Sequence, residues 1–407
     1  MNLPAEELTG GELAYADPGH PLLICARAVK PTGWDIPSPT PVTPWVPHVT
    51  PARWNEITGH YATLAPRMLR RLVRHQRRRR RERPIVLLYH RLGPVAPDPQ
   101  LLSVSAQHFA EHLRLIVEYY TPVRLGELVP AVERERAPQR AVAFTFDDGY
   151  ADNLSSVKPL LEQHEIPATV FVASGYVRNR HPFWWDELER LVLRPGRLPS
   201  VLTLEVAGET LEWELGGDAE YLSATAADRA AWTILDRLDS GPRQRIYREL
   251  CARLRVLDEP ERERALERLR SVSDPEVAST EMSRPVTPPE LARLGDGGLV
   301  DIGAHTVNHP VLSQLSAERQ REEIGVSKQQ LEEMLGQPVS SFAYPYGTPE
   351  DFDGATVSFV QDAGFAHAYA NVAGRVTRRT DPFRIPRLLV RDWSADELDR
   401  RLSVFAL

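Results

Sequence analysis

From residue 84 onward, short apolar segments alternate with amphipathic ones, and this alternation is the feature that most limits the possible folds. The apolar segments are rich in β-branched and aromatic residues, which is typical of buried strands. The segments between them carry apolar residues at helical spacing, as Phe109, Leu113 and Ile116 do. Strand, helix and strand repeated in this way imply right-handed βαβ units and a mostly parallel sheet, either closed as a barrel or open. The predicted strands are 84–89, 141–146, 168–173, 298–304, 340–345, 366–371 and 385–390.

The alternation is interrupted between about residues 181 and 285. This interval holds a hairpin-like segment, "LTLEVAGETLEWEL", followed by two charged helical stretches. It contains no candidate polar catalytic cluster, although the aromatic residues of "FWWDE" (183–187) could offer ring faces to a ligand; burial in a core is the more frequent fate of Trp. We therefore expect residues 84–407 to form one barrel domain with an insertion at about 181–285 that packs beside the barrel and shapes the substrate entrance.

Residues 1–83 differ in composition from the rest of the chain. The stretch 31–51 holds seven prolines and is expected to be an extended linker or a segment draped over the surface. The stretch 67–83 carries ten Arg and one Glu, although the formal net charge of the whole chain is −7. A basic segment on an acidic body favours a solvated tail, or a helix that contacts anionic membrane lipid, over a specific nucleic-acid-binding protein.

Export and membrane-spanning signals are not apparent in the sequence. The two cysteines, Cys25 and Cys251, form no metal-binding or disulfide framework, and no apolar run approaches the ~18 residues of a membrane-spanning helix. The N-terminus is acidic where a secretory signal would be basic. We expect a cytoplasmic protein, with peripheral membrane contact through residues 67–83 as the open alternative.

Two adjacent carboxylates, Asp147 and Asp148, follow the predicted strand 141–146 and precede Gly149. Asp-Gly is common in turns, so a purely structural turn is one interpretation. However, in both architectures the chemistry belongs at the carboxyl ends of the strands. Because two neighbouring negative charges repel, one carboxyl group would have a raised pKa unless a positive charge lies beside it. A bound cation would remove this conflict.

His305 and His309 follow the predicted strand 298–304 and are four residues apart, a spacing that suits two ligands of one metal. The spacing alone is weak evidence, because His108 and His112 share it on an amphipathic helix, where we expect structural residues at the surface or its boundary. Two histidines and one carboxylate leave an open position on a tetrahedral cation, as in a catalytic zinc site. If Asp148 is the third ligand, Asp147 is free to act as a base.

Three segments, "TFDDG", "HTVNHP" and "FAYPYG", together resemble the first three motifs of the polysaccharide deacetylase family, in family order. The resemblance covers roughly residues 84–180 and 286–400. It implies an α/β fold, the distorted (β/α) barrel of the NodB type, and the removal of N- or O-acetyl groups from sugars. With the expected insertion and an irregular N-terminal extension, this is the predicted fold class.

The resemblance also implies the roles of individual residues. Asp147 corresponds to the general base, and Asp148, His305 and His309 correspond to the ligands of a divalent metal, for which Zn²⁺ is the expected ion. The backbone N–H of Tyr346 corresponds to the oxyanion hole. The chain departs from the family pattern in two ways: Ala343 takes the place of an arginine that contacts the base, and the usual C-terminal Leu-x-His that supplies the general acid is missing.

A subgroup that resembles exopolysaccharide poly-N-acetylglucosamine deacetylases takes its general acid from an N-terminal "YH" at the end of the first strand. The segment "LLYHRL" fits this pattern and makes His90 the candidate acid. The alternative is a structural histidine at a strand end. We expect Arg387 or Arg391, together with Asp392, to orient His90.

The predicted function is therefore that of a hydrolase acting on carbon–nitrogen bonds other than peptide bonds. Its expected partner is an acetylated carbohydrate: a polysaccharide, a lipid-linked or nucleotide-linked precursor, or a small glycosylated metabolite. A phospho-acceptor receiver domain is disfavoured because no lysine follows a later strand, and a glycosidase because adjacent carboxylates cannot bracket a glycosidic bond. A catalytically silent carbohydrate-binding protein on the same fold remains the non-enzyme alternative.

Overall fold

The computed structural model describes residues 83–94, 96–276 and 284–404. Its central element is a sheet in which the strands run in the order β14-β13-β12-β6-β5-β1-β15, with the short strand β4 added beside β5, and every pairing within it is parallel. All seven predicted strands are present, although the last three are shorter than expected. The bounds are β1 Ile85–Tyr89, β4 Thr121–Pro122, β5 Ala141–Phe146, β6 Ala168–Val172, β12 Val300–Ala304, β13 Ser341–Ala343, β14 His367–Tyr369 and β15 Leu388–Leu389.

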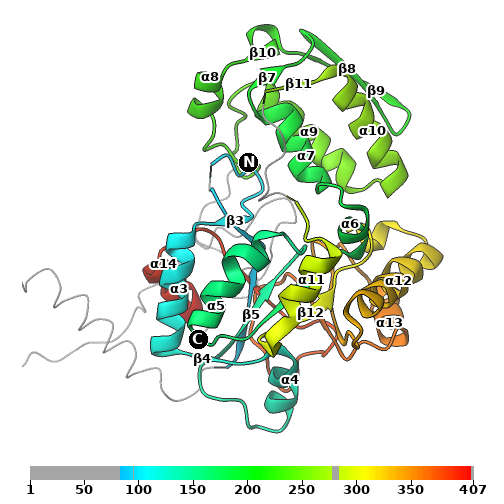
Figure 1. Cartoon of the computed structure of the whole chain (residues 1–407). Helices are drawn as coiled ribbons and strands as arrows, with labels where there is room; N and C mark the ends of the chain where they lie inside the picture. The colour runs from blue at the N-terminus through cyan, green and yellow to red at the C-terminus, as the bar shows by residue number, and fades with distance from the viewer. Residues whose placement is uncertain (1–82, 95, 277–283, 405–407) are drawn as a thin grey trace, which may run out of the picture. The chain divides into compact units, whose positions relative to one another are not determined.

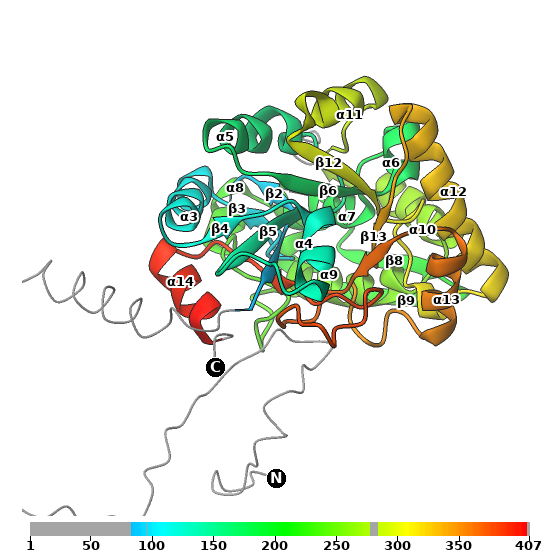
Figure 2. The same cartoon turned by 90° about the horizontal axis from the view of Figure 1, so that it is seen from below.

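The two ends of this sheet meet, so the sheet forms a barrel rather than an open surface. The strand β15 pairs with β1, and Ile385, three residues before β15, forms a parallel bridge with Tyr369 at the end of β14. The Ile385 N–H donates to the carbonyl oxygen of Ala368 at 2.9 Å. Because the closing contact is a single bridge, the barrel is distorted there. The predicted distorted (β/α) barrel is confirmed (Figure 2).

The strands are apolar on both faces because helices cover the outside and the barrel closes around the inside. In β1, Leu87 packs in the cluster that includes the surrounding helices, whereas Val86, on the opposite face, packs with Phe171, Tyr369 and residues of α4. Gly303 on β12 is required by close packing, because a Cβ there would lie 2.4 Å from the Phe171 ring. The interior is thus filled, and functional groups are confined to the ends of the strands.

Helices surround the barrel in the positions that the sequence pattern predicts (Figure 1). The helix α12 shows why they begin and end where they do: the Ser316 side chain caps its first turn, and Gly336, with a φ of 66°, ends it in the left-handed conformation. The outer helices are α3 Ala106–Tyr119, α5 Lys158–Gln163, α6 Ser174–Asn179, α11 Pro288–Gly295, α12 Ala317–Leu335, α13 Gly354–Asp362 and α14 Ala395–Val404. The helix α4, Leu125–Glu133, instead packs against the residues on the inner face of the strands.

The segment between α6 and α11 has a hydrophobic core of its own. Trp213 of the hairpin, Leu250 and Leu266 pack there with the aromatic residues that follow α6. The predicted hairpin is present, with β8 paired antiparallel to β9, and the two charged stretches are helices (Figure 1). We call residues 181–276 the insertion. Its elements are α7 Trp184–Leu193, β7 Gly196–Arg197, β8 Val201–Val206, β9 Glu209–Glu214, β10 Glu220–Tyr221, α8 Ser223–Asp228, α9 Pro242–Arg255, α10 Glu259–Val272 and β11 Asp274–Pro275.

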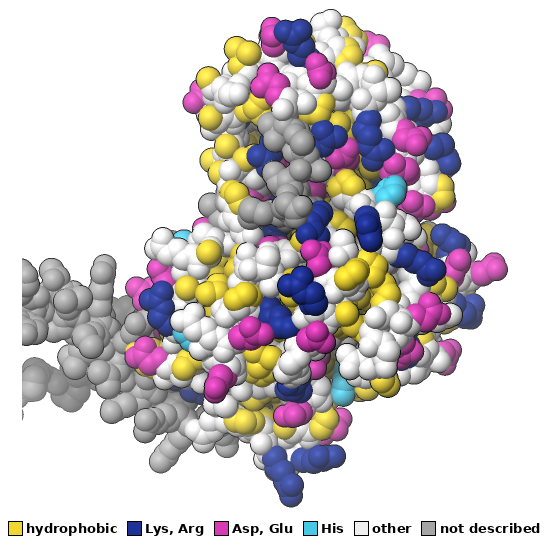
Figure 3. All heavy atoms as spheres, viewed as in Figure 1, with side chains coloured by type: hydrophobic (Ala, Val, Ile, Leu, Met, Phe, Trp, Pro, Cys, Tyr) yellow, Lys and Arg dark blue, Asp and Glu magenta, His cyan; other side chains and the backbone are white. Residues whose placement is uncertain are grey.

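The expectations for the N-terminal extension, residues 1–83, lie outside the described residues apart from Arg83. None of the helices in the described ranges is both long and apolar enough to cross a membrane. On the face that Figure 3 shows, basic and acidic side chains are interspersed over the described part of the chain rather than gathered by sign. That face therefore offers no large surface of one charge.

Candidate metal centre and active site

Three neighbouring strands end in polar residues at the same edge of the barrel. The Asp147 N–H donates to the carbonyl oxygen of Tyr89 at 2.9 Å, which continues the pairing of β5 with β1. The Val390 N–H likewise donates to Leu88, which continues the pairing of β1 with β15. Carried one step further, these registers place His90 next to Asp147 and Arg391 next to His90. One layer at the carboxyl edge thus holds the candidate base and the candidate acid.

Asp148, His305 and His309 come together at this edge as a candidate metal triad. One ligand atom from each lies within 4.8 Å of the others. The carboxylate Oδ1 of Asp148 is 3.4 Å from Nε2 of His309 and 3.7 Å from Nε2 of His305. Asp148, His305 and His309 are 2%, 1% and 6% exposed, and no hydrogen-bond donor among the described residues satisfies Asp148 Oδ1. A buried, unsatisfied carboxylate oxygen facing two imidazoles fits a divalent cation.

The histidines have the protonation that a metal ligand requires. The Nδ1 of His305 lies 2.8 Å from the carbonyl oxygen of Ala343, so it carries the proton and leaves Nε2 as the free lone pair. Burial lowers the pKa of His305, and burial and the neighbouring His305 hold the pKa of His309 well below its ordinary value. Both imidazoles are therefore neutral.

The loops that carry these residues are strained, which is common at functional sites. Four non-glycine residues adopt positive φ there: Asp148 at 74°, Thr306 at 64°, His309 at 53° and Tyr346 at 58°. The carboxylate of Glu323 on α12 holds the histidine loop by accepting hydrogen bonds from two of its backbone N–H groups and an amide side chain. The fold thus fixes a conformation that these residues would not adopt in isolation.

The adjacent carboxylates have opposite electrostatic environments. Burial favours a raised pKa for Asp147, but Arg387 outweighs it through two hydrogen bonds of 2.7 and 2.8 Å, so the pKa lies below its ordinary value. For Asp148, burial and the negative charges of Asp147 and Asp186 hold the pKa well above its ordinary value. The pair therefore consists of one stabilised carboxylate and one that needs a cation to ionise.

Arg387 also corrects an expectation. Arg387 contacts Asp147 and not His90. It thus makes the contact that the family pattern assigns to an arginine at the position of Ala343. Asp392 is also not at His90: its Oδ1 lies 2.7 Å from Nδ1 of His108 and accepts from the N–H and hydroxyl of Ser105. The expected orientation of His90 by Asp392 is therefore wrong, because the chain turns after β15 and directs Asp392 to the start of α3.

His90 is half-buried, as Tyr346 is, whereas Asp147 is buried. Its carbonyl oxygen accepts from Asn153, but its imidazole has no hydrogen-bond partner among the described residues. Burial lowers its pKa to about 3, although the charge of Asp147 acts in the opposite direction. The imidazole is therefore neutral and available to a ligand.

Tyr346 lies at the other side of the triad. Its ring contacts the His309 ring edge to face, with centroids 4.7 Å apart. Within the described part of the chain, no acceptor takes its backbone N–H. The phenol oxygen is also buried without a partner. A free backbone donor beside a metal triad is the feature expected of an oxyanion hole.

The insertion contributes residues that the sequence analysis did not predict. The Trp185 ring lies 4.9 Å from the His309 ring, and the guanidinium of Arg255 lies 4.3 Å from the centre of the Tyr346 ring. Arg262 donates to the carbonyl oxygen of Asn308 at 3.2 Å. These residues come from α7, α9 and α10. Trp184 and Trp185 are buried, so they do not act as exposed faces for a sugar.

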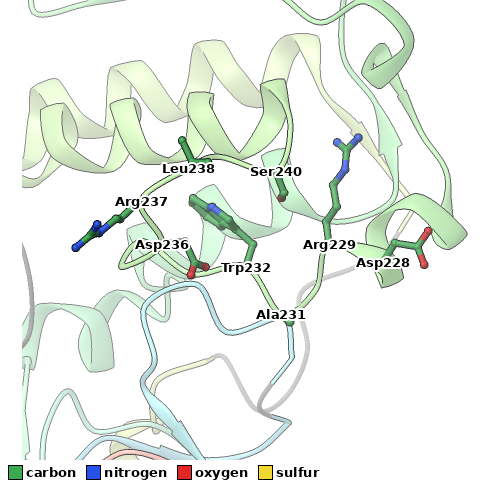
Figure 4. Close-up of a pocket in the computed structure, with 8 residues that line it drawn as sticks. All are labelled: Asp228, Arg229, Ala231, Trp232, Asp236, Arg237, Leu238 and Ser240. Carbon is green, nitrogen blue, oxygen red and sulfur yellow. The ribbon is translucent and has the colours of Figure 1, made fainter. Parts of the chain in front are cut away.

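A separate hollow of about 450 Å³ lies within the insertion (Figure 4). Trp232 stands at its centre, with Arg229 and Arg237 on either side. None of the residues that line it belongs to the barrel edge. It is therefore distinct from the candidate metal centre.

Part of the barrel is similar in sequence to known proteins. The family model "Polysaccharide deacetylase" matches residues 134–197 and 271–368, which flank most of the insertion. A sequence relative, "Putative polysaccharide deacetylase YxkH" of Bacillus subtilis, is 22% identical over 108 residues, which is 26% of this chain and 37% of that protein.

The Streptococcus pyogenes deacetylase PplD in complex with acetate is 16% identical and aligns over 79% of this chain and 98% of its own, with a TM-score of 0.48. IcaB from Ammonifex degensii is 17% identical over 80% and 97% of the two chains, with a TM-score of 0.46. Together with the three motifs at the barrel edge, the family match and the sequence relative show that the matched part of this chain is similar to the polysaccharide deacetylase family.

Proposed function

We propose that the protein is a metal-dependent carbohydrate deacetylase that hydrolyses the N-acetyl, or O-acetyl, group of an acetylated amino sugar. The observation that carries the proposal is the buried triad of Asp148, His305 and His309 beside an Asp147 that an arginine keeps ionised. The family match supports the reaction class.

The triad would hold one divalent cation, most simply Zn²⁺, through two imidazole nitrogens and one carboxylate oxygen. When bound, such an ion acts as a Lewis acid toward the acetyl carbonyl and lowers the pKa of water toward neutrality. It would also neutralise Asp148, whose pKa is otherwise raised by burial and by Asp147. The Ala343 carbonyl fixes the tautomer of His305.

Asp147 would act as the general base. Arg387 grips both of its oxygens and keeps it ionised, so it can accept a proton from water as the water oxygen adds to the acetyl carbon. The charge that develops on the carbonyl oxygen would be stabilised by the free N–H of Tyr346; loss of one such donor typically costs on the order of 10²–10³ in rate.

His90 would act as the general acid. Its lowered pKa makes it neutral in the free protein, so it must first receive a proton. We propose that it receives the proton that Asp147, its neighbour in the strand register, takes from water. That proton then goes to the departing nitrogen as the carbon–nitrogen bond breaks, and the products are acetate and a free amine.

Acetate release from a panel of acetylated amino sugars tests this proposal. The wild-type protein reconstituted with Zn²⁺ should release acetate, a chelator should abolish the release, and Asp147→Asn should lose it while still binding the ion. Binding of a sugar without acetate release in any metal form would instead favour the silent carbohydrate-binding alternative.

We further propose that residues 67–83 attract the protein to anionic lipid, because ten arginines in that stretch carry enough charge for surface binding. Deletion of residues 67–83 should reduce partition to vesicles containing phosphatidylserine and leave partition to neutral vesicles unchanged. Equal partition of the deleted and intact proteins to anionic vesicles would overturn this proposal.

A further inference from the structure

Arg391 stands at the barrel edge without an acidic partner. The residue follows β15, lies beside His90 in the strand register and is half-buried. Within the described ranges, no carboxylate lies at ion-pair distance from its guanidinium. The acid whose charge acts on it, Asp98, already accepts hydrogen bonds from Arg91 and from the N–H groups of Leu102 and Ser103.

The guanidinium of Arg391 is nevertheless held in place. Its Nη1 donates to the carbonyl oxygen of Gln100 at 3.0 Å and also to that of Leu101, which has a positive φ of 57°. The other guanidinium nitrogens, Nε and Nη2, have no partner in the part of the chain that the structure describes. The side chain is therefore an anchored fork that still offers donors beside the candidate acid.

A second unneutralised arginine lies on the other side of the triad. Arg262 of α10 is 2% exposed, and its Nη2 donates to Asn308, next to His309. Its Nη1 is buried without a hydrogen-bond partner among the described residues. Its charge acts on both His309 and Tyr346. A buried cation without a counter-charge is costly, so it indicates a missing anionic partner.

Other arginines around the edge show the contrast. Arg387 is paired with Asp147, Arg91 with Asp186 and Arg255 with Asp351. The buried Arg243 in the insertion lacks an acid but donates to four carbonyl oxygens, which satisfies each of its nitrogens. Among the described residues, Arg391 and Arg262 have neither an acidic partner nor enough carbonyl acceptors for all their nitrogens. Both lie beside the triad.

We propose that the acetylated sugar bound at this site carries an anionic group, a phosphate or a carboxylate, that the Arg391 fork binds, with Arg262 adding positive charge from the opposite side. The inference rests on the proposed deacetylation and narrows its substrate class. A planar guanidinium with free donors is suited to two-point binding of such oxyanions.

The first test compares kcat/KM for N-acetylglucosamine with that for N-acetylglucosamine 1-phosphate and for an N-acetylated aminohexuronate. The wild-type protein should prefer an anionic sugar by on the order of 10- to 100-fold, the range expected of a charge-assisted contact. The phosphate and carboxylate arms identify the source of the charge. In Arg391→Gln the ratio of anionic to neutral kcat/KM should fall toward one.

Arg378→Gln is the matched control, because it removes the same charge from an exposed arginine that is paired with Glu135. It should leave the ratio at the wild-type value. A wild-type ratio near one for both anionic sugars would overturn the inference while leaving the deacetylase proposal standing. An equal fall of the ratio in Arg391→Gln and Arg378→Gln would do the same, since it would reveal only a long-range charge effect.

A binding test separates this inference from the reaction itself. Calorimetric titration of Asp147→Asn with N-acetylglucosamine 1-phosphate should give affinity that is lost on adding Arg391→Gln and retained on adding Arg378→Gln. This result supports the anion site even if no sugar releases acetate, which would count against the proposed function alone. Equal affinity in Asp147→Asn with and without Arg391→Gln would contradict the inference.

Discussion

Two pairs of histidines in this chain share the same four-residue spacing, and the structure gives them opposite roles. His305 and His309 leave the end of β12 on a strained loop and face the carboxylate of Asp148. His108 and His112 lie on α3, and among the described residues they belong to no group of side chains that could hold a metal ion. His108 pairs with Asp392, and His112 contacts the Tyr89 hydroxyl at 3.2 Å and the Trp393 carbonyl at 2.7 Å.

This difference shows that the four-residue spacing of two histidines is less informative than the strand or helix that carries them. A parallel strand directs the residues that follow it to a common edge, where other strands deliver their own polar groups. A helix directs residues four apart to one face, and on α3 that face packs against the barrel. His112 is fully buried, which corrects the expectation that it lies at the surface or its boundary.

The largest expected effect comes from substituting a histidine in each of the two pairs and comparing the activities. His305→Ala or His309→Ala removes a metal ligand, so activity should fall by more than the roughly 10–100-fold that loss of an outer-shell partner costs. His112→Gln should retain the wild-type kcat/KM, measured by acetate release. Comparable losses in His305→Ala and His112→Gln would erase the distinction between the pairs.

The second prediction concerns the base beside the triad. Arg387→Met removes the positive charge that lowers the pKa of Asp147, so this pKa should rise. A general base acts only when ionised, so the acid limb of the kcat/KM profile should move to higher pH. Arg387→Lys, which keeps a charge but loses the two-point contact, should show a smaller shift in the same direction. An acid limb that stays at its wild-type pH in Arg387→Met would exclude Asp147 as the group seen in that limb.

The third prediction concerns stability at the structural pair. Burial lowers the pKa of His112 to about 4, below the ordinary value of 6.5. Between these two values the unfolded chain binds the additional proton, so the free energy of unfolding should rise with pH by up to about 1.4 kcal/mol per pH unit. The contribution is complete above pH 6.5 and is lost as the pH falls toward 4.

Urea unfolding across this range measures the effect as the difference between wild type and His112→Gln. The variant should lack this part of the slope. It should also be destabilised at neutral pH by about 1–3 kcal/mol, because the Tyr89 hydroxyl and the Trp393 carbonyl lose a partner. Identical slopes in the two proteins would show that His112 does not titrate in this range.

The smallest effect is expected at His108. This residue and Asp392 are both partly exposed, so their pairing should contribute at most about 1 kcal/mol. Asp392→Asn should therefore lower the stability only slightly and leave the pH profile of kcat/KM unchanged. A displaced alkaline limb in Asp392→Asn would restore the earlier expectation that this carboxylate orients His90.

The sequence pattern predicts the parallel sheet because each strand is a continuous apolar run between turn signals, whereas closure into a barrel follows only from the resemblance to the deacetylase family. It also predicts which residues meet at the edge, since Asp148 and His305 each directly follow such a run. It names Arg387 but does not predict its contact with Asp147, because Arg387 precedes β15 in a chain with 46 arginines and has no distinguishing neighbour. The contact of Trp185 with His309 depends on how the insertion packs on the loops. Sequence periodicity does not indicate this packing.

The most direct test of the central claim is the number of Zn²⁺ ions bound per chain after chelation, reconstitution and gel filtration, measured by plasma mass spectrometry. The account predicts one ion per chain in wild type and in His112→Gln, and close to none in Asp148→Asn and His305→Ala. Retention of one ion by folded Asp148→Asn and His305→Ala proteins, or its loss in His112→Gln alone, would contradict it.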